Sequence, residues 1–94
     1  MIIAVDFDGT IMQSDGSPNV QLIHWLRGNQ RNGNIVILWS CRTGSRLVEA
    51  IKFCQRNGLN PNYVNANAPQ AIRMLGSDPR KIYADIYIDD KNAR

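Results

Sequence analysis

The stretch Ile2-Ile3-Ala4-Val5, followed at once by Asp6-Phe7-Asp8-Gly9-Thr10, decides the fold class of this chain. Four apolar residues in a row, three of them β-branched, are typical of a parallel strand that is buried on both faces. The acidic turn that follows is typical of the edge where parallel strands end and where such sheets carry their sites. The stretch therefore predicts a central strand over residues 2–5 with polar side chains at its carboxyl end.

Three further segments have strand patterns. Residues 35–39, Ile35-Val36-Ile37-Leu38-Trp39, repeat the continuous apolar run of a buried strand. Residues 62–65 are a shorter candidate within a cluster of asparagines that we interpret as turn formers. Residues 82–88 alternate, which predicts a half-exposed edge strand. Its two sides would be Ile82, Ala84, Ile86 and Ile88 against Tyr83, Asp85 and Tyr87.

Three helices are predicted between these strands. Ser17-Pro18 has the pattern of an N-cap followed by proline at the first helical position, and this helix should end near Gly33. A second helix should begin at Ser45 and be closed by Gly58, and a brief third helix should occupy residues 69–76, starting at its proline. The apolar positions of the first two helices are Leu22, Ile23, Leu26, Leu47, Val48, Ile51 and Cys54.

Strands and helices alternate in this predicted order, which implies parallel pairing through right-handed crossovers. A chain of 94 residues has room for one thin core, since it buries only about 60–65% of the surface that it exposes when unfolded. We therefore expect a single α/β domain over residues 1–94. It should be a small, three-layer, Rossmann-like parallel sheet of about four strands with helices on both faces.

The composition excludes several classes of protein. The net charge of +3 comes from basic residues scattered between Arg27 and Arg94 without a run, which gives little support to nucleic-acid binding. The apolar start at residues 1–5 lacks a basic lead, and no stretch approaches the roughly 18 apolar residues of a membrane span. Cys41 and Cys54 are expected to be free thiols. We expect a cytoplasmic protein without a membrane partner.

Acidic residues stand where the predicted strands stop. Asp6 and Asp8 follow the first strand, and Asp89-Asp90 follow the last. The carboxyl ends of parallel strands meet at one rim, and alternate residues of an extended segment point to the same side, so these side chains should converge. Such crowding requires a cation. Hard oxygen ligands favour Mg²⁺, which typically joins one or two carboxylates to a substrate phosphate.

Other residues at this rim suit a phosphate group. Ser40 offers a hydroxyl, and the turn at Gly9 offers backbone N–H groups that can approach closely. Lys81 can add a positive charge, and Arg80 rivals it because both precede the last strand. A carboxylate shielded by Mg²⁺ can attack phosphorus to form an acyl phosphate, while a second carboxyl group protonates the leaving oxygen and later activates water.

Taken in order, these residues resemble the four motifs of phosphatases of the haloacid dehalogenase (HAD) superfamily. The motif residues are Asp6-Phe7-Asp8-Gly9-Thr10, Ser40, Lys81 and Asp89-Asp90. The resemblance covers nearly the whole chain and implies a HAD-like fold. It also implies a hydrolase that acts on phosphomonoesters, because members with a second aspartate at the position of Asp8 are phosphatases.

The resemblance implies roles for the acidic residues. Asp6 would be the nucleophile that forms an aspartyl-phosphate, and it would also bind Mg²⁺. Asp8 would be the general acid and base, and its carbonyl oxygen would bind the same metal ion. Asp89 and Asp90 would be the remaining acids of the metal site, and either could bind the metal directly.

The resemblance also implies contacts with the phosphate. Ser40 and Lys81 would hold it, with Phe7 and Cys41 beside the first and second motifs as further phosphate-binding residues. No cap domain fits into the short segments between the motifs, so the chain resembles the small capless subgroup. The substrate would be a small-molecule or nucleotide phosphomonoester, with a nucleic-acid end as a further option. An exposed last strand would favour a homodimer through that edge.

Three alternatives remain at this stage. The segment Cys41-Arg42-Thr43-Gly44-Ser45-Arg46 is similar to the loop of cysteine phosphatases, although its spacing is one residue short. A receiver-like module would be phosphorylated stably on an aspartate beside Mg²⁺, and Asp8 argues against this alternative. A non-catalytic phosphate-binding module is the third. Arg42 either contacts substrate or only lies on the rim, and His24 is expected at the surface.

Overall fold

Helices and strands alternate along the chain in the computed structural model, which describes residues 1–78 and 81–90. The elements, in order, are β1 (Ile2–Asp6), α1 (Val20–Arg31), β2 (Ile35–Trp39), α2 (Gly44–Arg56), β3 (Tyr63–Val64), α3 (Pro69–Leu75) and β4 (Ile86–Ile88). Each of the predicted elements is present. Both cysteines are free, as expected, Cys41 at the surface and Cys54 in the core.

The strands form one sheet in the order β3-β2-β1-β4, and every pair is parallel. Val5 of β1 pairs with Leu38 of β2 on one side and with Ile88 of β4 on the other, so these three strands end at nearly the same level. Parallel strands in this order bring the residues after β1, β2 and β4 to one rim. The predicted parallel sheet is confirmed.

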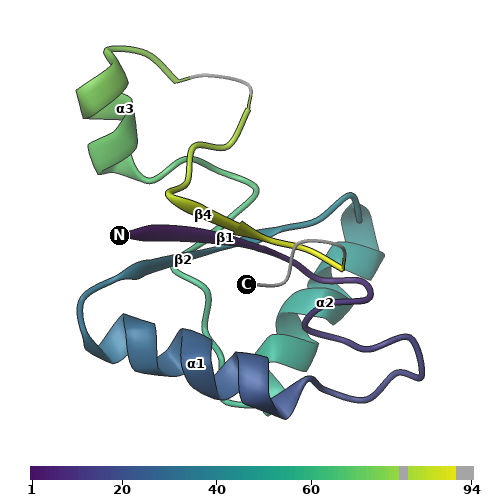
Figure 1. Cartoon of the computed structure of the whole chain (residues 1–94). Coiled ribbons are helices and arrows are strands. Elements are labelled where there is room, and N and C mark those ends of the chain that lie inside the picture. Colours follow the sequence, from purple (N-terminus) through teal and green to yellow (C-terminus); the bar gives the residue numbers. More distant parts are fainter. Residues whose placement is uncertain (79–80, 91–94) are drawn as a thin grey trace.

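Helices cover both faces of the sheet (Figure 1), with α1 and α2 on one face and α3 on the other. Alternate residues of β1 point to opposite faces, so Ile3 and Val5 join the larger core with α1 and α2, whereas Ile2 and Ala4 pack near Ala71 of α3. The three-layer α/β architecture is therefore confirmed. None of the helices within the described residues combines the length and apolarity needed to cross a membrane.

The start of α1 differs from the prediction. Asn19 is the N-cap, and its Oδ1 accepts a hydrogen bond of 3.2 Å from the N–H of Leu22. Ser17 instead belongs to the preceding turn, where both its N–H and its hydroxyl donate to Asp15 Oδ1. Pro18 lies in an isolated bridge with Met12 and not in the helix. Because the side chain of Ser17 is held by Asp15, the helix begins later, at Val20.

The last strand is shorter than predicted, because side chains bond the backbone that precedes it. The N–H of Tyr83 donates to Asn67 Oδ1 over 2.6 Å, and the N–H of Ile2 donates to Asp85 Oδ2 over 2.7 Å. Asp85 also bonds β1 through its own N–H, which donates to the carbonyl of Ile2 over 2.8 Å. The paired strand β4 nevertheless covers only residues 86–88 at one edge of the sheet.

This shortening also changes the faces predicted for residues 82–88. Ile86 and Ile88 contact the larger core, but Ile82 and Ala84 belong to the core on the opposite face. Tyr87 belongs to that second core as well, where its hydroxyl donates to the carbonyl of Ile82 and accepts from the N–H of Ala84. The predicted single alternation is wrong because only three residues are extended in register.

Candidate active site

The ends of β1, β2 and β4 enclose a cavity of about 140 Å³ at the rim of the sheet. Its lining consists of Asp6, Trp39, Ser40, Cys41, Asp89 and Asp90. Three carboxylates from opposite ends of the chain therefore face one small space, beside the hydroxyl of Ser40. The lining contains three of the four acids that were expected to converge, and Asp8 is not part of it.

Asp6 is the last residue of β1 and is only partly exposed. Its Oδ1 accepts a hydrogen bond of 2.8 Å from the N–H of Phe7. Burial raises the pKa of Asp6 above its usual value, the Phe7 hydrogen bond opposes this, and the negative charges of Asp8, Asp90 and Asp89 raise the pKa further. Negative charge is therefore concentrated around Asp6 at this cavity.

Gly9 allows the turn after β1 to pass close to Asp90. Its φ is +75°, a conformation that L side chains rarely adopt, and a Cβ at this position would lie 3.4 Å from the Cβ of Asp90. A larger residue at Gly9 would therefore strain the turn and crowd Asp90. Gly9 brings the first and last acidic segments of the chain into contact.

The donor set of this cavity fits a hard divalent cation. Carboxylate oxygens are the ligands that Mg²⁺ prefers. Burial raises the pKa of Asp6 most, and a cation would offset the charges of Asp8, Asp90 and Asp89 that raise it further. Within residues 1–78 and 81–90, no three carboxylate, thiol or imidazole side chains form a ready-made metal cage. Mg²⁺ commonly keeps several waters and is bound by one or two carboxylates together with a substrate phosphate.

Ser40 is held by an asparagine side chain that the sequence did not single out. The N–H of Ser40 donates to Asn65 Oδ1 over 2.8 Å, and Asn65 Nδ2 donates to the Ser40 carbonyl over 3.0 Å. The Ser40 Oγ accepts from the N–H of Arg42 over 3.1 Å, which leaves its own hydrogen available as a donor. Asn65 has a φ of +50°, and asparagine tolerates this conformation better than most residues.

Phe7 and Cys41 differ in their access to the cavity. Cys41 is exposed and lines it. Phe7 lies outside the lining, because its ring is buried edge-on against Phe53 with the centroids 5.4 Å apart. The backbone of Phe7 is therefore the part that can contribute to a phosphate contact.

Asp8 is not in the lining of the cavity and is paired with Arg42. Two hydrogen bonds join them, from Arg42 Nε to Oδ2 over 3.0 Å and from Nη2 to Oδ1 over 2.8 Å. The Asp8 side chain is 51% exposed and that of Arg42 is 12% exposed. The hydrogen bond from Arg42 lowers the pKa of Asp8 below its usual value. Arg42 was expected either to contact substrate or only to lie on the rim, and its carboxylate partner is Asp8.

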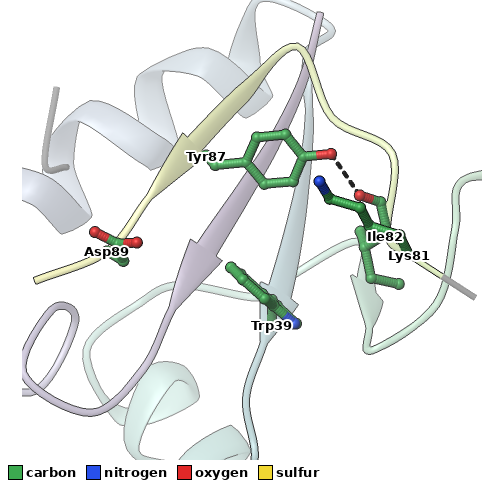
Figure 2. A pocket seen from close by; sticks show the side chains of 5 residues that line it. All are labelled: Trp39, Lys81, Ile82, Tyr87 and Asp89. Carbon is green, nitrogen blue, oxygen red and sulfur yellow. Dashed lines mark hydrogen bonds between the residues drawn. The ribbon is translucent and has the colours of Figure 1, made fainter. Parts of the chain in front are cut away.

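Lys81 lines a second pocket, of about 170 Å³, which shares Trp39 and Asp89 with the acidic cavity. Figure 2 shows Lys81 and Asp89 at opposite ends of this pocket, with Trp39 and Tyr87 between them. The Nζ of Lys81 lies 6.0 Å from the centroid of the Tyr87 ring. Lys81 is thus next to the cavity and not in its lining. Its rival, Arg80, lies outside the described residues.

Comparison with known proteins gives one informative similarity. A conserved protein from Bacteroides thetaiotaomicron has a solved structure that matches this chain with a TM-score of 0.81 and 38% sequence identity. The match covers 98% of this chain and 77% of that one. A scan against protein-family models and a search of curated proteins found no match.

Proposed function

This chain belongs to the same family as that conserved Bacteroides protein, and we propose that it is a Mg²⁺-dependent phosphomonoester hydrolase of the HAD type. The observation that supports this most strongly is the shared cavity of Asp6, Asp89 and Asp90, with the Ser40 hydroxyl beside them. These side chains come from the ends of three strands, and together they suit a metal ion and a transferred phosphoryl group. The proposal includes a cytoplasmic location and phosphomonoester substrates.

In the first half of the reaction, the Asp6 carboxylate attacks phosphorus, and the bond between phosphorus and the leaving oxygen breaks. Asp8 gives its proton to that oxygen, so that the alcohol departs neutral. Ser40 donates its hydroxyl hydrogen to a phosphoryl oxygen. The backbone of Phe7 and the side chain of Cys41 lie on either side of the phosphoryl group. Lys81 adds positive charge from the adjoining pocket.

In the second half, Asp8 takes a proton from water, and the water oxygen attacks phosphorus. The bond between phosphorus and the Asp6 oxygen breaks, which restores the carboxylate and yields inorganic phosphate. Mg²⁺, held by Asp6 with Asp89 or Asp90 and the Asp8 carbonyl, would neutralise charge on the phosphoryl oxygens. The sum of both halves is ester plus water giving alcohol plus phosphate.

The test is the release of inorganic phosphate from a broad panel of phosphomonoesters, with Mg²⁺ and with a chelator. We expect Asp6→Asn to lower kcat by at least about a thousandfold, because loss of a covalent nucleophile removes the chemical route. Cys41→Ala should retain activity. Metal-independent turnover that is lost in Cys41→Ala would instead support the cysteine mechanism, and no release from any compound would refute the phosphatase.

The pairing of Asp8 with Arg42 favours one second candidate, a receiver-like phosphoacceptor. If Asp8 stays bound to Arg42 after phosphorylation, it cannot activate water, and the aspartyl-phosphate of Asp6 would persist. The two functions differ in the lifetime of that species. Acid-quenched protein after reaction with a small phosphodonor should carry little phosphate if the chain is a phosphatase, and nearly one equivalent if it is a phosphoacceptor.

A further inference from the structure

A basic groove of about 360 Å³ runs along α2 on the Asp8 side of the rim. Its lining includes Arg42, Lys52, Arg56 and Glu49, together with Phe7 and Phe53. Glu49 offsets one of the three cations and Asp8, outside the lining, is paired with Arg42, so one positive charge stays in excess. The groove therefore has the charge of a site for an anion, although basic residues look scattered along the sequence.

Aromatic rings hold two of these cations in place. The Arg42 guanidinium carbon lies 4.8 Å from the centroid of Phe7, and that of Arg56 lies 5.9 Å from the centroid of Phe53. The two rings contact each other edge to face. Arg42 is fixed further by Asp8 and by the carbonyl of Arg46. Cations that are positioned in this way lose less side-chain entropy when they bind an anion.

The proposed reaction places the leaving group on the side of this groove. Asp8 gives its proton to the leaving oxygen, so that oxygen must come within hydrogen-bond reach of Asp8. Asp8 is bonded to Arg42 through both carboxylate oxygens, and Arg42 lines the groove. A leaving group that extends beyond Asp8 therefore meets Arg42 first and then the cations of α2.

The sizes of the two cavities also indicate that the phosphoryl group binds in the acidic cavity and the leaving group in the groove. The acidic cavity of about 140 Å³ is smaller than the roughly 300–1,000 Å³ of most ligand sites, so it suits a phosphoryl group and an ion. The groove, at about 360 Å³, falls within that range.

We propose that the substrate is a phosphomonoester whose leaving group carries a second phosphate, and that this phosphate binds in the groove between Arg42, Lys52 and Arg56. This inference rests on the proposed phosphatase function.

The second phosphate has two sources with the same chemistry, a small bisphosphate or the phosphodiester of a nucleic-acid end. Four compounds separate them: adenosine 5′-monophosphate, adenosine 3′,5′-bisphosphate, a 5′-phosphorylated dinucleotide, and the same dinucleotide with an uncharged methylphosphonate linkage. The bisphosphate is compared with adenosine 5′-monophosphate, and the charged dinucleotide with its methylphosphonate analogue. In at least one of these two pairs, we expect kcat/KM of the compound with the second negative phosphate to be at least tenfold higher. Equal kcat/KM within both pairs would overturn the inference.

Variants test whether the groove causes the preference. Lys52→Gln and Arg56→Gln each remove one exposed charge, and each should lower kcat/KM for the charged compound by up to about fivefold, the upper end for exposed ion pairs. The loss should be smaller for adenosine 5′-monophosphate, which has no second phosphate to place in the groove. The matched control is Arg73→Gln in α3, which removes the same charge on the opposite face of the sheet. A preference that survives in the double variant Lys52→Gln/Arg56→Gln would overturn the inference.

A binding measurement separates this inference from the phosphatase proposal. Calorimetry with the Asp6→Asn variant gives dissociation constants for all four compounds without turnover. Tighter binding of a charged compound than of its counterpart, abolished in the double variant on this background, supports the groove even if no compound is hydrolysed. Equal dissociation constants overturn the groove even if the wild-type protein releases phosphate from every compound.

Discussion

At the scale of single residues, two aspartates only two positions apart have opposite environments. Asp6 is partly buried among other carboxylates, which raises its pKa, whereas Asp8 is paired with Arg42, which lowers its pKa. The proposed hydrolysis needs the reverse order, with Asp6 ionised and Asp8 protonated. A divalent cation at the rim would lower the pKa of Asp6. Release of Asp8 from Arg42 would raise the pKa of Asp8 toward its ordinary value.

The Asp8–Arg42 pair leads to a prediction about pH dependence. In Arg42→Gln the pKa of Asp8 should rise, so the fall of activity with increasing pH, as the general acid loses its proton, should move to higher pH. Each unit of pKa changes the protonated fraction roughly tenfold well above the pKa. The measurement is kcat against pH for benzyl phosphate, whose alcohol needs a proton to leave. The leaving group of 4-nitrophenyl phosphate needs no proton, so the high-pH limb of its profile should not move. A high-pH limb for benzyl phosphate that stays fixed would contradict the role of Arg42.

At the scale of elements, β3 is only two residues long, and asparagine side chains extend its pairing with β2. Asn62 Oδ1 accepts from the N–H of Val36, and Asn65 bonds both backbone groups of Ser40. The backbone N–H groups of the same two asparagines donate to the carbonyls of Val36 and Leu38. A short strand is thus held at both ends, and its second end positions the serine of the site.

Asn65 therefore supports both stability and activity. Asn65→Ala should lower the free energy of unfolding by about 2–4 kcal/mol, because it removes two hydrogen bonds of about 1 kcal/mol each and forces alanine into a left-handed conformation. Asn65→Gly relieves the conformational strain but still lacks the bonds, so it should cost less. Urea unfolding measures both. Loss of the bonds should also lower kcat in both variants, and unchanged activity in Asn65→Gly would show that Ser40 does not depend on them.

At the scale of the whole molecule, the ionised form of Asp6 opposes folding, because burial and the neighbouring carboxylates raise its pKa. Because the folded-state pKa of Asp6 is raised, the unfolded chain loses this proton first as the pH rises from about 4, and the free energy of unfolding falls until Asp6 is ionised in both states. Strands from both ends of the chain supply these acids. This loss of stability therefore arises when the strands pair and bring the acids together, and it is absent from the unfolded chain.

Urea unfolding tests this penalty. Asp6→Asn should be as stable as the wild type near pH 3 and more stable at pH 7. Mg²⁺ at a hundred times its dissociation constant should stabilise the wild-type protein by about 2.7 kcal/mol and Asp6→Asn much less. Asp15→Asn, in the turn before α1, is the control and should keep the full effect of Mg²⁺. A wild-type protein that Mg²⁺ does not stabilise would contradict a metal site at this rim.

The sheet edge at β4 leads to a prediction about association. Three residues of β4 form the edge beside β1, and an unpaired strand edge can pair with a second copy of the chain. We predict a homodimer through this edge. Light scattering should then give a mass that rises from monomer to dimer with concentration, and a monomer throughout the micromolar range would refute it.

The sequence alone determined the alternation of strands and helices, the parallel sheet and the meeting of Asp6, Ser40, Asp89 and Asp90 at one rim. These features follow from local hydrophobic runs and from a topology that brings all strand ends together. The free thiols and the glycine stop of α3 were predicted for the same local reasons.

Only the tertiary structure decided the pairing of Asp8 with Arg42, the support of Ser40 by Asn65, the helix cap at Asn19 and the late start of the last strand. It also gathered Arg42, Lys52 and Arg56 into one groove. Each of these features depends on which of several side chains forms the hydrogen bond or ion pair with a given polar or charged group. The partner is chosen by distances between segments that are far apart in the sequence. Hydrophobic periodicity, in contrast, can be read within each segment alone.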